Sequence, residues 1–229
     1  MMRIGEKIMR QWMHLRLQPI RVFCLHHVCQ CFDDETMHEG DWMALNLFQA
    51  KIKKMQQSGV EFLSLSEAYK HLKHDYFRTK KYAVLAFDDG YASLKEVLPW
   101  IKARCIPVTL FVNSDYACGK AYRETEKETY LTIEELSAAQ VEIGMHGLQH
   151  IDATKMGEDE FRFFVGETIQ ATAMLDGYIP FWAYTWGRHT PTTDSILKEN
   201  GIIPVLVDGM KNYNNTSCIH RELLEKYGV

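Results

Sequence analysis

Two neighbouring carboxylates, Asp88 and Asp89, stand at the end of the apolar run 82–87 (YAVLAF), and Gly90 follows them. Adjacent carboxylates repel each other, and a divalent cation beside Asp89 would offset that repulsion and keep the side chain ionised. Successive side chains of an extended segment point in different directions. We therefore expect Asp89 to bind a metal ion while Asp88 faces a water on that ion and acts as its base. A plain Asp-Gly turn is the alternative for this motif.

A pair of histidines four residues apart, His146 and His150 in HGLQH, offers further metal ligands. If the segment forms a helical turn, four residues rise about 6 Å and both imidazoles lie on one face. Two imidazoles and a carboxylate from another strand form a three-ligand site with positions left for water. The sequence therefore predicts one divalent ion held by Asp89, His146 and His150. Zinc suits this donor set best, and cobalt, nickel, manganese and iron stay open.

Short apolar runs alternate with longer amphipathic segments along the chain. The apolar runs predict strands at 20–28, 60–65, 81–87, 107–113, 141–146, 179–184 and 202–207. Helices are expected at 42–59, 67–73 (capped by Ser66), 93–104 (kinked or broken at Pro99), 132–139 (with a capping box of Thr132 and Glu135), 158–176 and 192–200. Strands buried on both faces read as continuous apolar runs. The alternation therefore predicts an α/β fold in which parallel strands, covered by outer helices, close into a barrel.

Polar side chains follow several of the predicted strands at the point where each strand ends. Asp88 follows one strand, His26 ends another, and His146 ends a third, while Tyr184 and Trp186 follow a fourth. In a parallel barrel, the chemistry lies on the loops at the carboxyl ends of the strands. The predicted fold therefore gathers these side chains at one end of the barrel.

The composition is that of an ordinary globular protein, with 46% hydrophobic and 24% charged residues among 229. A net charge of −4 without long blocks of one sign argues against a nucleic-acid partner. No segment approaches the roughly 20 apolar residues of a membrane span, and the N-terminal segment lacks the apolar stretch of a secretory signal, so we expect a cytoplasmic protein. The six cysteines are expected to be reduced, with Cys24 and Cys105 inside strands or helices. We expect a single domain over residues 1–229, with an extension at 1–19 and a core from about 20 to 224.

Three segments carry a resemblance to a known family: LAFDDGY (85–91), EIGMHGLQH (142–150) and the intervening strand PVTLFVNS (107–114). Together they resemble the NodB-like polysaccharide deacetylases, carbohydrate esterase family 4. The segment CLHHV (24–28) is similar to the opening of the branch that deacetylates poly-N-acetylglucosamine, with Leu25 in place of a tyrosine. The resemblance implies a distorted (β/α)7 barrel, with Asp88 as the catalytic base and Asp89 and the two histidines of the second motif as metal ligands. It places His26 among the substrate or oxyanion contacts.

The third motif, FWAYTWGRHT (181–190), departs from the family pattern. Trp186 falls where members often have the second tyrosine of a Phe-Ala-Tyr-Pro-Tyr-Gly run, and Thr185 falls at the proline. In the family, the main-chain amide of that aromatic residue donates to the oxyanion, and a backbone donor survives the change to tryptophan. Tyr184 and Trp186 are therefore candidate oxyanion or substrate residues, with core packing as the alternative.

The last motif lies in CIHRELLEKYG (218–228). Members of the family often end with a Leu-His pair, whose histidine acts as the acid, or with a lone arginine. His220 is accordingly the candidate catalytic acid, and Arg221 is a candidate partner that orients Asp88. Residues at the start of a helix are the alternative for both.

The resemblance implies metal-dependent hydrolysis of an N-acetyl group on an amino sugar, in a polysaccharide or its biosynthetic precursor. Asp88 takes the proton of the metal-bound water that attacks the acetyl carbonyl, the metal ion and the amide of Trp186 hold the oxyanion, and His220 or another acid protonates the leaving amine. A nucleotide-linked or lipid-linked sugar fits the expected compartment. Two alternatives are a non-catalytic barrel that keeps the metal and binds glycans, and an amidase of the same fold that acts on a non-sugar C–N bond. The sequence gives no indication of the oligomeric state.

Overall fold

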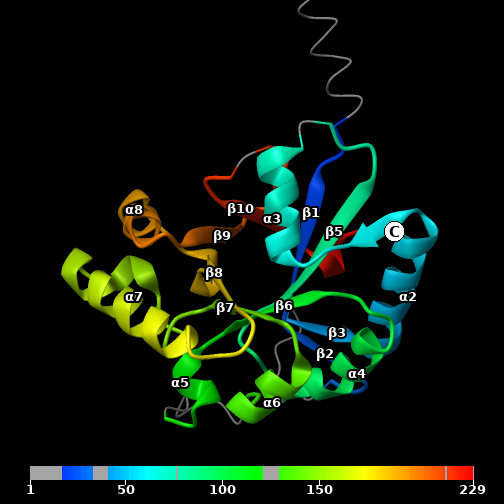
Figure 1. The fold of residues 1–229 in the computed structure, drawn as a ribbon. Coiled ribbons are helices and arrows are strands. Elements are labelled where there is room, and N and C mark those ends of the chain that lie inside the picture. The colour runs from blue at the N-terminus through cyan, green and yellow to red at the C-terminus, as the bar shows by residue number, and fades with distance from the viewer. Residues whose placement is uncertain (1–16, 33–40, 76, 121–128, 215, 229) are drawn as a thin grey trace, which may run out of the picture.

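The computed structural model describes residues 17–32, 41–75, 77–120, 129–214 and 216–228, in which strands and helices alternate along the chain (Figure 1). The strands are β1 (Ile20–Leu25), β2 (His27–Cys29), β3 (Trp42–Ala44), β4 (Val60–Phe62), β5 (Lys81–Phe87), β6 (Val108–Val112), β7 (Glu142–Met145), β8 (Tyr178–Ala183), β9 (Ile203–Val207) and β10 (Ile219–Leu223). The α-helices are α2 (Leu45–Gln57), α3 (Leu65–His74), α4 (Leu98–Lys102), α5 (Ser114–Ala117), α6 (Ile133–Ala139), α7 (Glu158–Thr172) and α8 (Pro191–Glu199). Short 3₁₀ helices are η1 (Ala92–Glu96), η2 (Ala153–Lys155), η3 (Thr185–Gly187) and η4 (Leu224–Lys226).

The parallel strands close into a barrel. Within the described residues, β1, β10, β9, β8, β7, β6 and β5 are hydrogen-bonded in that order, and pairing of β5 with β1 closes the ring. The closing ladder runs from Ile20 opposite Tyr82 to Leu25 opposite Phe87. β4 pairs with residues 81–83 of β5 and extends the sheet there. β6 pairs with residues 85–87 of β5. The predicted single-domain (β/α)7 barrel is confirmed.

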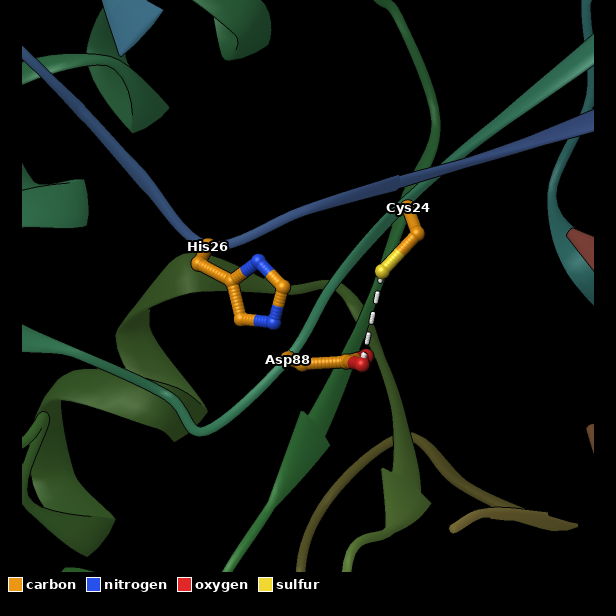
Figure 2. A group of neighbouring side chains, drawn as sticks. All are labelled: Cys24, His26 and Asp88. Atoms are coloured by element: carbon orange, nitrogen blue, oxygen red, sulfur yellow. Dashed lines mark hydrogen bonds between the residues drawn. The ribbon is translucent and has the colours of Figure 1, made fainter. Parts of the chain in front are cut away.

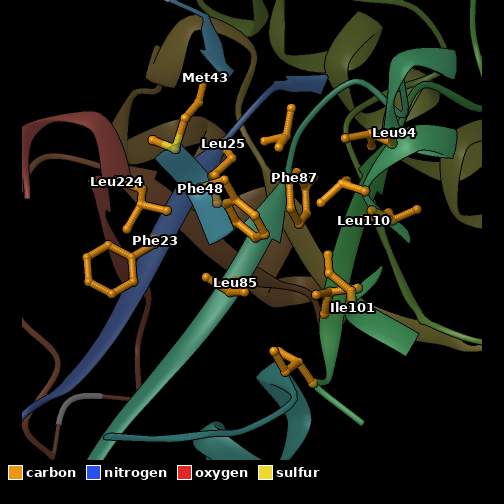
Figure 3. Packing of buried hydrophobic residues seen from close by; sticks show 14 of the residues in the cluster. Phe23, Leu25, Met43, Phe48, Leu85, Phe87, Leu94, Ile101, Leu110 and Leu224 are labelled. Carbon is orange, nitrogen blue, oxygen red and sulfur yellow. The ribbon is translucent and has the colours of Figure 1, made fainter. Parts of the chain in front are cut away.

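Residues of β5 alternate between two apolar layers, as side chains of a strand must. Val84 and Ala86 belong to an inner layer to which β1, β6, β8, β9 and β10 also contribute, and α3 packs against this layer. Leu85 and Phe87 belong to an outer layer with residues of α2 and α4, among them Phe48 (Figure 3). Because both faces of β5 are covered by apolar side chains, its sequence is apolar without a break from Tyr82 to Phe87.

In the amino-terminal half of the chain, several strands and helices begin or end at other residues than the sequence predicted. The strand predicted over 20–28 is divided at His26: β1 joins the barrel, whereas β2 pairs with β3 in a separate sheet. The cap of α3 is Ser64 rather than Ser66, because the Ser64 hydroxyl accepts from the Glu67 amide while the Glu67 carboxylate accepts from the Ser64 amide. Pro99 breaks the helix predicted over 93–104 into η1 and α4, where it takes an N-terminal position that needs no amide proton.

The capping box of α6, formed by Thr132 and Glu135, is confirmed. The alternative that His220 and Arg221 begin a helix does not hold, because Ile219–Leu223 form β10. All six cysteines are free thiols, but Cys105 is exposed, which contradicts the interior position expected for it. In the part of the chain that the structure describes, no helix combines the length and apolar character of a membrane span. Residues 1–16 of the predicted N-terminal extension lie outside the described ranges.

Candidate active site

Asp89, His146 and His150 meet at the carboxyl end of the barrel. Oδ1 of Asp89 lies 3.5 Å from Nε2 of His146 and 3.5 Å from Nε2 of His150. These distances are long for hydrogen bonds, but two ligands bound at about 2.1 Å in a tetrahedral arrangement are about 3.4 Å apart. The residues present therefore fit one divalent ion.

The backbone brings these ligands together in a way that the sequence reasoning did not foresee. Residues 148–150 form a bend, and no helical turn joins His146 to His150. Gly147 has a φ of +97°, and an added Cβ there would meet a backbone oxygen at 2.9 Å, so the chain reverses at a position only glycine fits. Asp89 has a φ of 67° and is left-handed rather than extended. Turn geometry, and not helical or strand periodicity, aims the ligands at a common point.

Neighbouring groups fix the orientation of two ligands. Nδ1 of His146 donates to the carbonyl oxygen of Ala183 at 2.8 Å, which leaves the lone pair of Nε2 directed at Asp89. Nδ2 of Asn113 donates to Oδ1 of Asp89 at 3.1 Å. Asn113 was not among the predicted site residues. Asn113 directly follows β6. The expectation that functional residues lie just after the strands of a parallel barrel therefore applies to it as well.

Asp88 is buried and paired with Arg221, as the sequence predicted for that arginine. Nη1 and Nη2 of Arg221 donate to Oδ1 and Oδ2 of Asp88 at 2.5 and 2.9 Å. Burial alone raises the pKa of Asp88, but the charge of Arg221 and its hydrogen bonds outweigh that effect and lower the pKa to about 2. Burial likewise lowers the pKa of Arg221, and Asp88 more than restores it. Asp88 is therefore an ionised carboxylate, held in one orientation by a two-point contact.

Cys24 and His26 point toward Asp88 from β1 and the bend that follows it (Figure 2). Sγ of Cys24 donates to Oδ2 of Asp88 at 3.5 Å, and one donor atom from each of the three residues lies within 4.8 Å of the others. Both oxygens of Asp88 already accept from Arg221, whose positive charge disfavours a second cation here. Cys24 was missed by the sequence reasoning, although its position two residues before His26 in the strand predicted over 20–28 is the signal for a shared face.

One cavity of about 390 Å³ contains both groups of side chains. It is lined by Cys24, His26, Asp41, Asp88, Asp89, Tyr91, His146, His150, Tyr184, Trp186, Gly187, Val207 and Leu223. A larger hollow of about 870 Å³ lies beside the amino ends of β6, β7 and β8 and contains none of these residues. The smaller cavity is the candidate site, because it lies at the end of the barrel where the strands terminate.

Tyr184 and Trp186 have different environments. Trp186 lines the cavity with an indole that is 56% exposed and that packs edge-on against the ring of His150, at a centroid distance of 4.3 Å. Its φ of 52° puts it in the left-handed turn of η3. Tyr184 is buried, and its hydroxyl donates to Asp194 at 2.9 Å. The core-packing interpretation therefore suits Tyr184 and does not suit Trp186.

The structure places His220 outside the cavity. Its Nδ1 lies 2.6 Å from Oδ2 of Asp208, and its Nε2 lies 3.6 Å from Sγ of Cys218. Arg221 points into the barrel, so its neighbour in β10 points to the other side. This geometry does not support the prediction of His220 as catalytic acid, whereas His26 lies beside Asp88 in the cavity.

The barrel is similar to several solved structures, each less than a quarter identical in sequence. IcaB from Ammonifex degensii has a TM-score of 0.73 and 23% identity, with 91% of this chain and 93% of that chain covered. The deacetylase PplD from Streptococcus pyogenes, solved with acetate, has a TM-score of 0.77 and 20% identity over 92% and 94% of the two chains. A de-N-acetylase from Aggregatibacter actinomycetemcomitans has a TM-score of 0.78 and 14% identity over 93% and 97%. These likenesses show a shared fold.

The sequence itself identifies the family. No curated protein sequence matches the chain. The family model for polysaccharide deacetylases matches residues 75–205, more than half of the chain, and this stretch contains Asp88, Asp89, His146 and His150. The chain therefore belongs to the polysaccharide deacetylase family, whose members are carbohydrate deacetylases that act on the C–N bond of N-acetyl groups.

Proposed function

We propose that this protein is a metal-dependent hydrolase that removes N-acetyl groups from an amino sugar in a polysaccharide or its biosynthetic precursor. One observation carries the proposal: a three-ligand set and a separate ionised carboxylate face the same cavity. Deacetylation by water needs both an electrophilic centre and a base that are held apart, and this arrangement supplies them.

Asp89, His146 and His150 would hold the ion. One carboxylate and two imidazoles favour zinc, and cobalt, nickel, manganese and iron accept the same donors. A divalent ion bound there would polarise the acetyl carbonyl and make the attacking water more acidic.

Asp88 takes the proton of the attacking water. A carboxylate with a pKa of about 2 is a weak base, so it serves only a water whose proton has itself become acidic. Arg221 holds both oxygens of Asp88, which fixes the direction from which the carboxylate approaches that proton. The contact with Arg221 therefore makes Asp88 a weaker base but holds its carboxylate in a fixed orientation.

His26 is the group we assign as the acid that protonates the leaving amine. Its ring faces Asp88, and its Nδ1 lies 3.8 Å from Oδ1 of Asp41. Because both neighbours of His26, Asp88 and Asp41, are carboxylates, the imidazole can take up a proton beside them. It can then deliver that proton to the leaving amine in the cavity. The turn at Trp186 supports the role of its main-chain amide as a donor to the oxyanion, because a left-handed residue beside Gly187 brings backbone to the cavity wall.

A cytoplasmic location, with a nucleotide-linked or lipid-linked sugar as the substrate, forms part of the proposal. All six cysteines are free thiols, which suits a reducing compartment.

The test pairs elemental analysis of the purified protein with an acetate-release assay. The substrates are monomeric, nucleotide-linked, lipid-linked and polymeric N-acetylated sugars, with non-sugar amides as a comparison. Replacement of Asp88 by Asn should abolish acetate release and leave the metal content unchanged. Full activity in that variant contradicts the role of Asp88. Glycan binding without acetate release at any metal loading would instead favour a non-catalytic barrel, and release only from non-sugar amides would favour an amidase.

A further inference from the structure

A cysteine, a histidine and an aspartate lie in a row on the outer side of β10. Sγ of Cys218 lies 3.6 Å from Nε2 of His220, and Nδ1 of His220 lies 2.6 Å from Oδ2 of Asp208. Arg221 points into the barrel toward Asp88, so the alternation along the strand directs His220 away from the candidate active site. The three side chains form a separate cluster that the proposed deacetylation does not use.

The order of the three groups distinguishes a proton relay from a metal site. Metal ligands converge on one point, whereas Cys218 and Asp208 contact opposite nitrogens of the same imidazole. In nucleophilic relays, a carboxylate orients an imidazole, which accepts the proton of the nucleophile. Asp208 accepts the hydrogen bond from Nδ1 of His220, and this assignment of the tautomer leaves Nε2 to accept from the thiol.

The imidazole is fixed in place while the thiol is reachable. The backbone amide of His220 donates to Oδ1 of Asn212 at 2.9 Å, and its carbonyl oxygen accepts from Nδ2 of Asn212 at 2.7 Å. The side chain of His220 is 9% exposed, whereas Cys218 is only partly buried. A base held beside an accessible thiol is the geometry that an activated cysteine needs.

The surroundings of Cys218 disfavour a thiolate that stands alone. Burial raises the pKa of Cys218, which disfavours an isolated thiolate. Transfer of the proton to His220 replaces that isolated charge by an alternating row of thiolate, imidazolium and carboxylate. Further groups that act on the thiol include the hydroxyl of Ser217 and the ammonium of Lys198, which lower its pKa, and the carboxylates of Asp194 and Asp208, which raise it.

We propose that Cys218 is a nucleophilic thiol, activated by His220 and Asp208, whose reaction partners are low-molecular-weight disulfides. Cys218 passes its proton to Nε2 of His220, and its sulfur attacks one sulfur of the disulfide. The disulfide bond breaks, and the departing thiolate takes the proton from His220. The products are a mixed disulfide on Cys218 and one free thiol, so the incoming disulfide is the oxidant and the exchange is balanced.

The test compares cysteines within the intact protein. Iodoacetamide is added and quenched at intervals, and the alkylation of each cysteine is followed by peptide mass spectrometry. At neutral pH we expect Cys218 to react about tenfold faster than the exposed Cys31, Cys105 and Cys118. Its rate should change little as the pH rises, whereas an ordinary thiol gains about tenfold per unit below its pKa. Oxidised glutathione should then form its adduct on Cys218 first.

Two variants separate activation from simple exposure. His220→Gln should reduce the rate at Cys218 to that of the exposed cysteines or below, and Asp208→Asn should give an intermediate rate. His74→Gln, at the exposed end of α3, is the matched control. Unchanged alkylation of the exposed cysteines in each variant verifies that the fold is intact. If Cys218 reacts more slowly than Cys105 at every pH, or if neither variant changes its rate, the proposal is overturned.

Discussion

Arg221 contacts both carboxylate oxygens of Asp88, although 133 positions separate the two residues in the sequence. The contact exists because β1 pairs with β5 on one side and with β10 on the other, so the last strand of the barrel lies one strand away from the DDG motif. β10 thus supplies Arg221 to the same site to which the DDG motif supplies Asp88.

Replacement of Arg221 by Lys tests orientation apart from charge. Lysine keeps a positive charge beside Asp88 but cannot make the two-point contact. We expect kcat to fall by about 10- to 100-fold with little change in KM, because the carboxylate is mispositioned in the transition state. Steady-state kinetics of acetate release measure both constants.

Arg221→Met provides the companion experiment for the charge itself. Without the guanidinium, burial raises the pKa of Asp88, so the acid limb of the activity profile should move to higher pH. The unpaired carboxylate should also cost about 3–5 kcal/mol of unfolding free energy. A lysine variant with unchanged kcat, or a methionine variant with an unmoved pH profile, contradicts the positioning role.

Removal of single metal ligands should remove both metal and activity. Asp89→Ala, His146→Ala and His150→Ala each leave two donors, and we expect metal affinity to fall by at least about 100-fold. Elemental analysis after dialysis gives the metal content, and His74→Ala serves as a histidine control at an exposed position. Full metal retention in all three ligand variants would exclude this site.

The choice between His26 and His220 as catalytic acid can be made with two glutamine variants. His26→Gln should lower kcat for an N-acetyl sugar by about 100-fold, because the amine must be protonated to leave. An aryl acetate, whose phenolate leaves without help, should lose much less. His220→Gln should keep kcat within about threefold for both substrates. The reverse pattern restores the original prediction for His220.

The barrel was predictable from the sequence wherever a strand is buried by apolar residues alone. β5 is apolar without a break from Tyr82 to Phe87, and the strand was placed at its observed bounds. β10, with the sequence IHREL, was missed because three of its five side chains are polar. Arg221 is tolerated in the barrel interior because Asp88 neutralises it, and the family resemblance indicated that pairing although the apolar pattern did not indicate the strand.

The metal ligands were predictable by residue type and spacing, but the reason for their convergence was not. A helical turn was expected between His146 and His150, and the chain instead reverses at Gly147 with a positive φ. We expected the side chains of Asp88 and Asp89 to point in different directions because the segment is extended. In the structure they do so because Asp89 has a left-handed backbone conformation. Sequence periodicity describes regular elements, whereas these residues lie just beyond them, where individual φ and ψ values decide direction.

The exposed indole of Trp186 should affect substrate binding more than turnover. Trp186→Ala removes an aromatic surface beside the cavity but keeps the main-chain amide assigned to the oxyanion. We expect KM for a glycan to rise by about three- to tenfold with kcat nearly unchanged, the loss typical of one aromatic contact. A large fall in kcat at constant KM would mean that the indole itself acts in the transition state.

Acid should weaken the fold through the pair of Asp88 and Arg221. The pKa of Asp88 is about 2 in the folded protein, below the ordinary value of 3.8, so folding favours the ionised form. Its contribution, about 2 kcal/mol, is fully present above about pH 4 and is lost as the pH falls through about 2. A double variant, Asp88→Asn with Arg221→Met, lacks this titrating pair. Between pH 4 and 2, its unfolding free energy should therefore fall by about 2 kcal/mol less than that of the unmodified protein. Urea denaturation of both proteins at several pH values measures the difference, and parallel curves would show that the pair does not contribute.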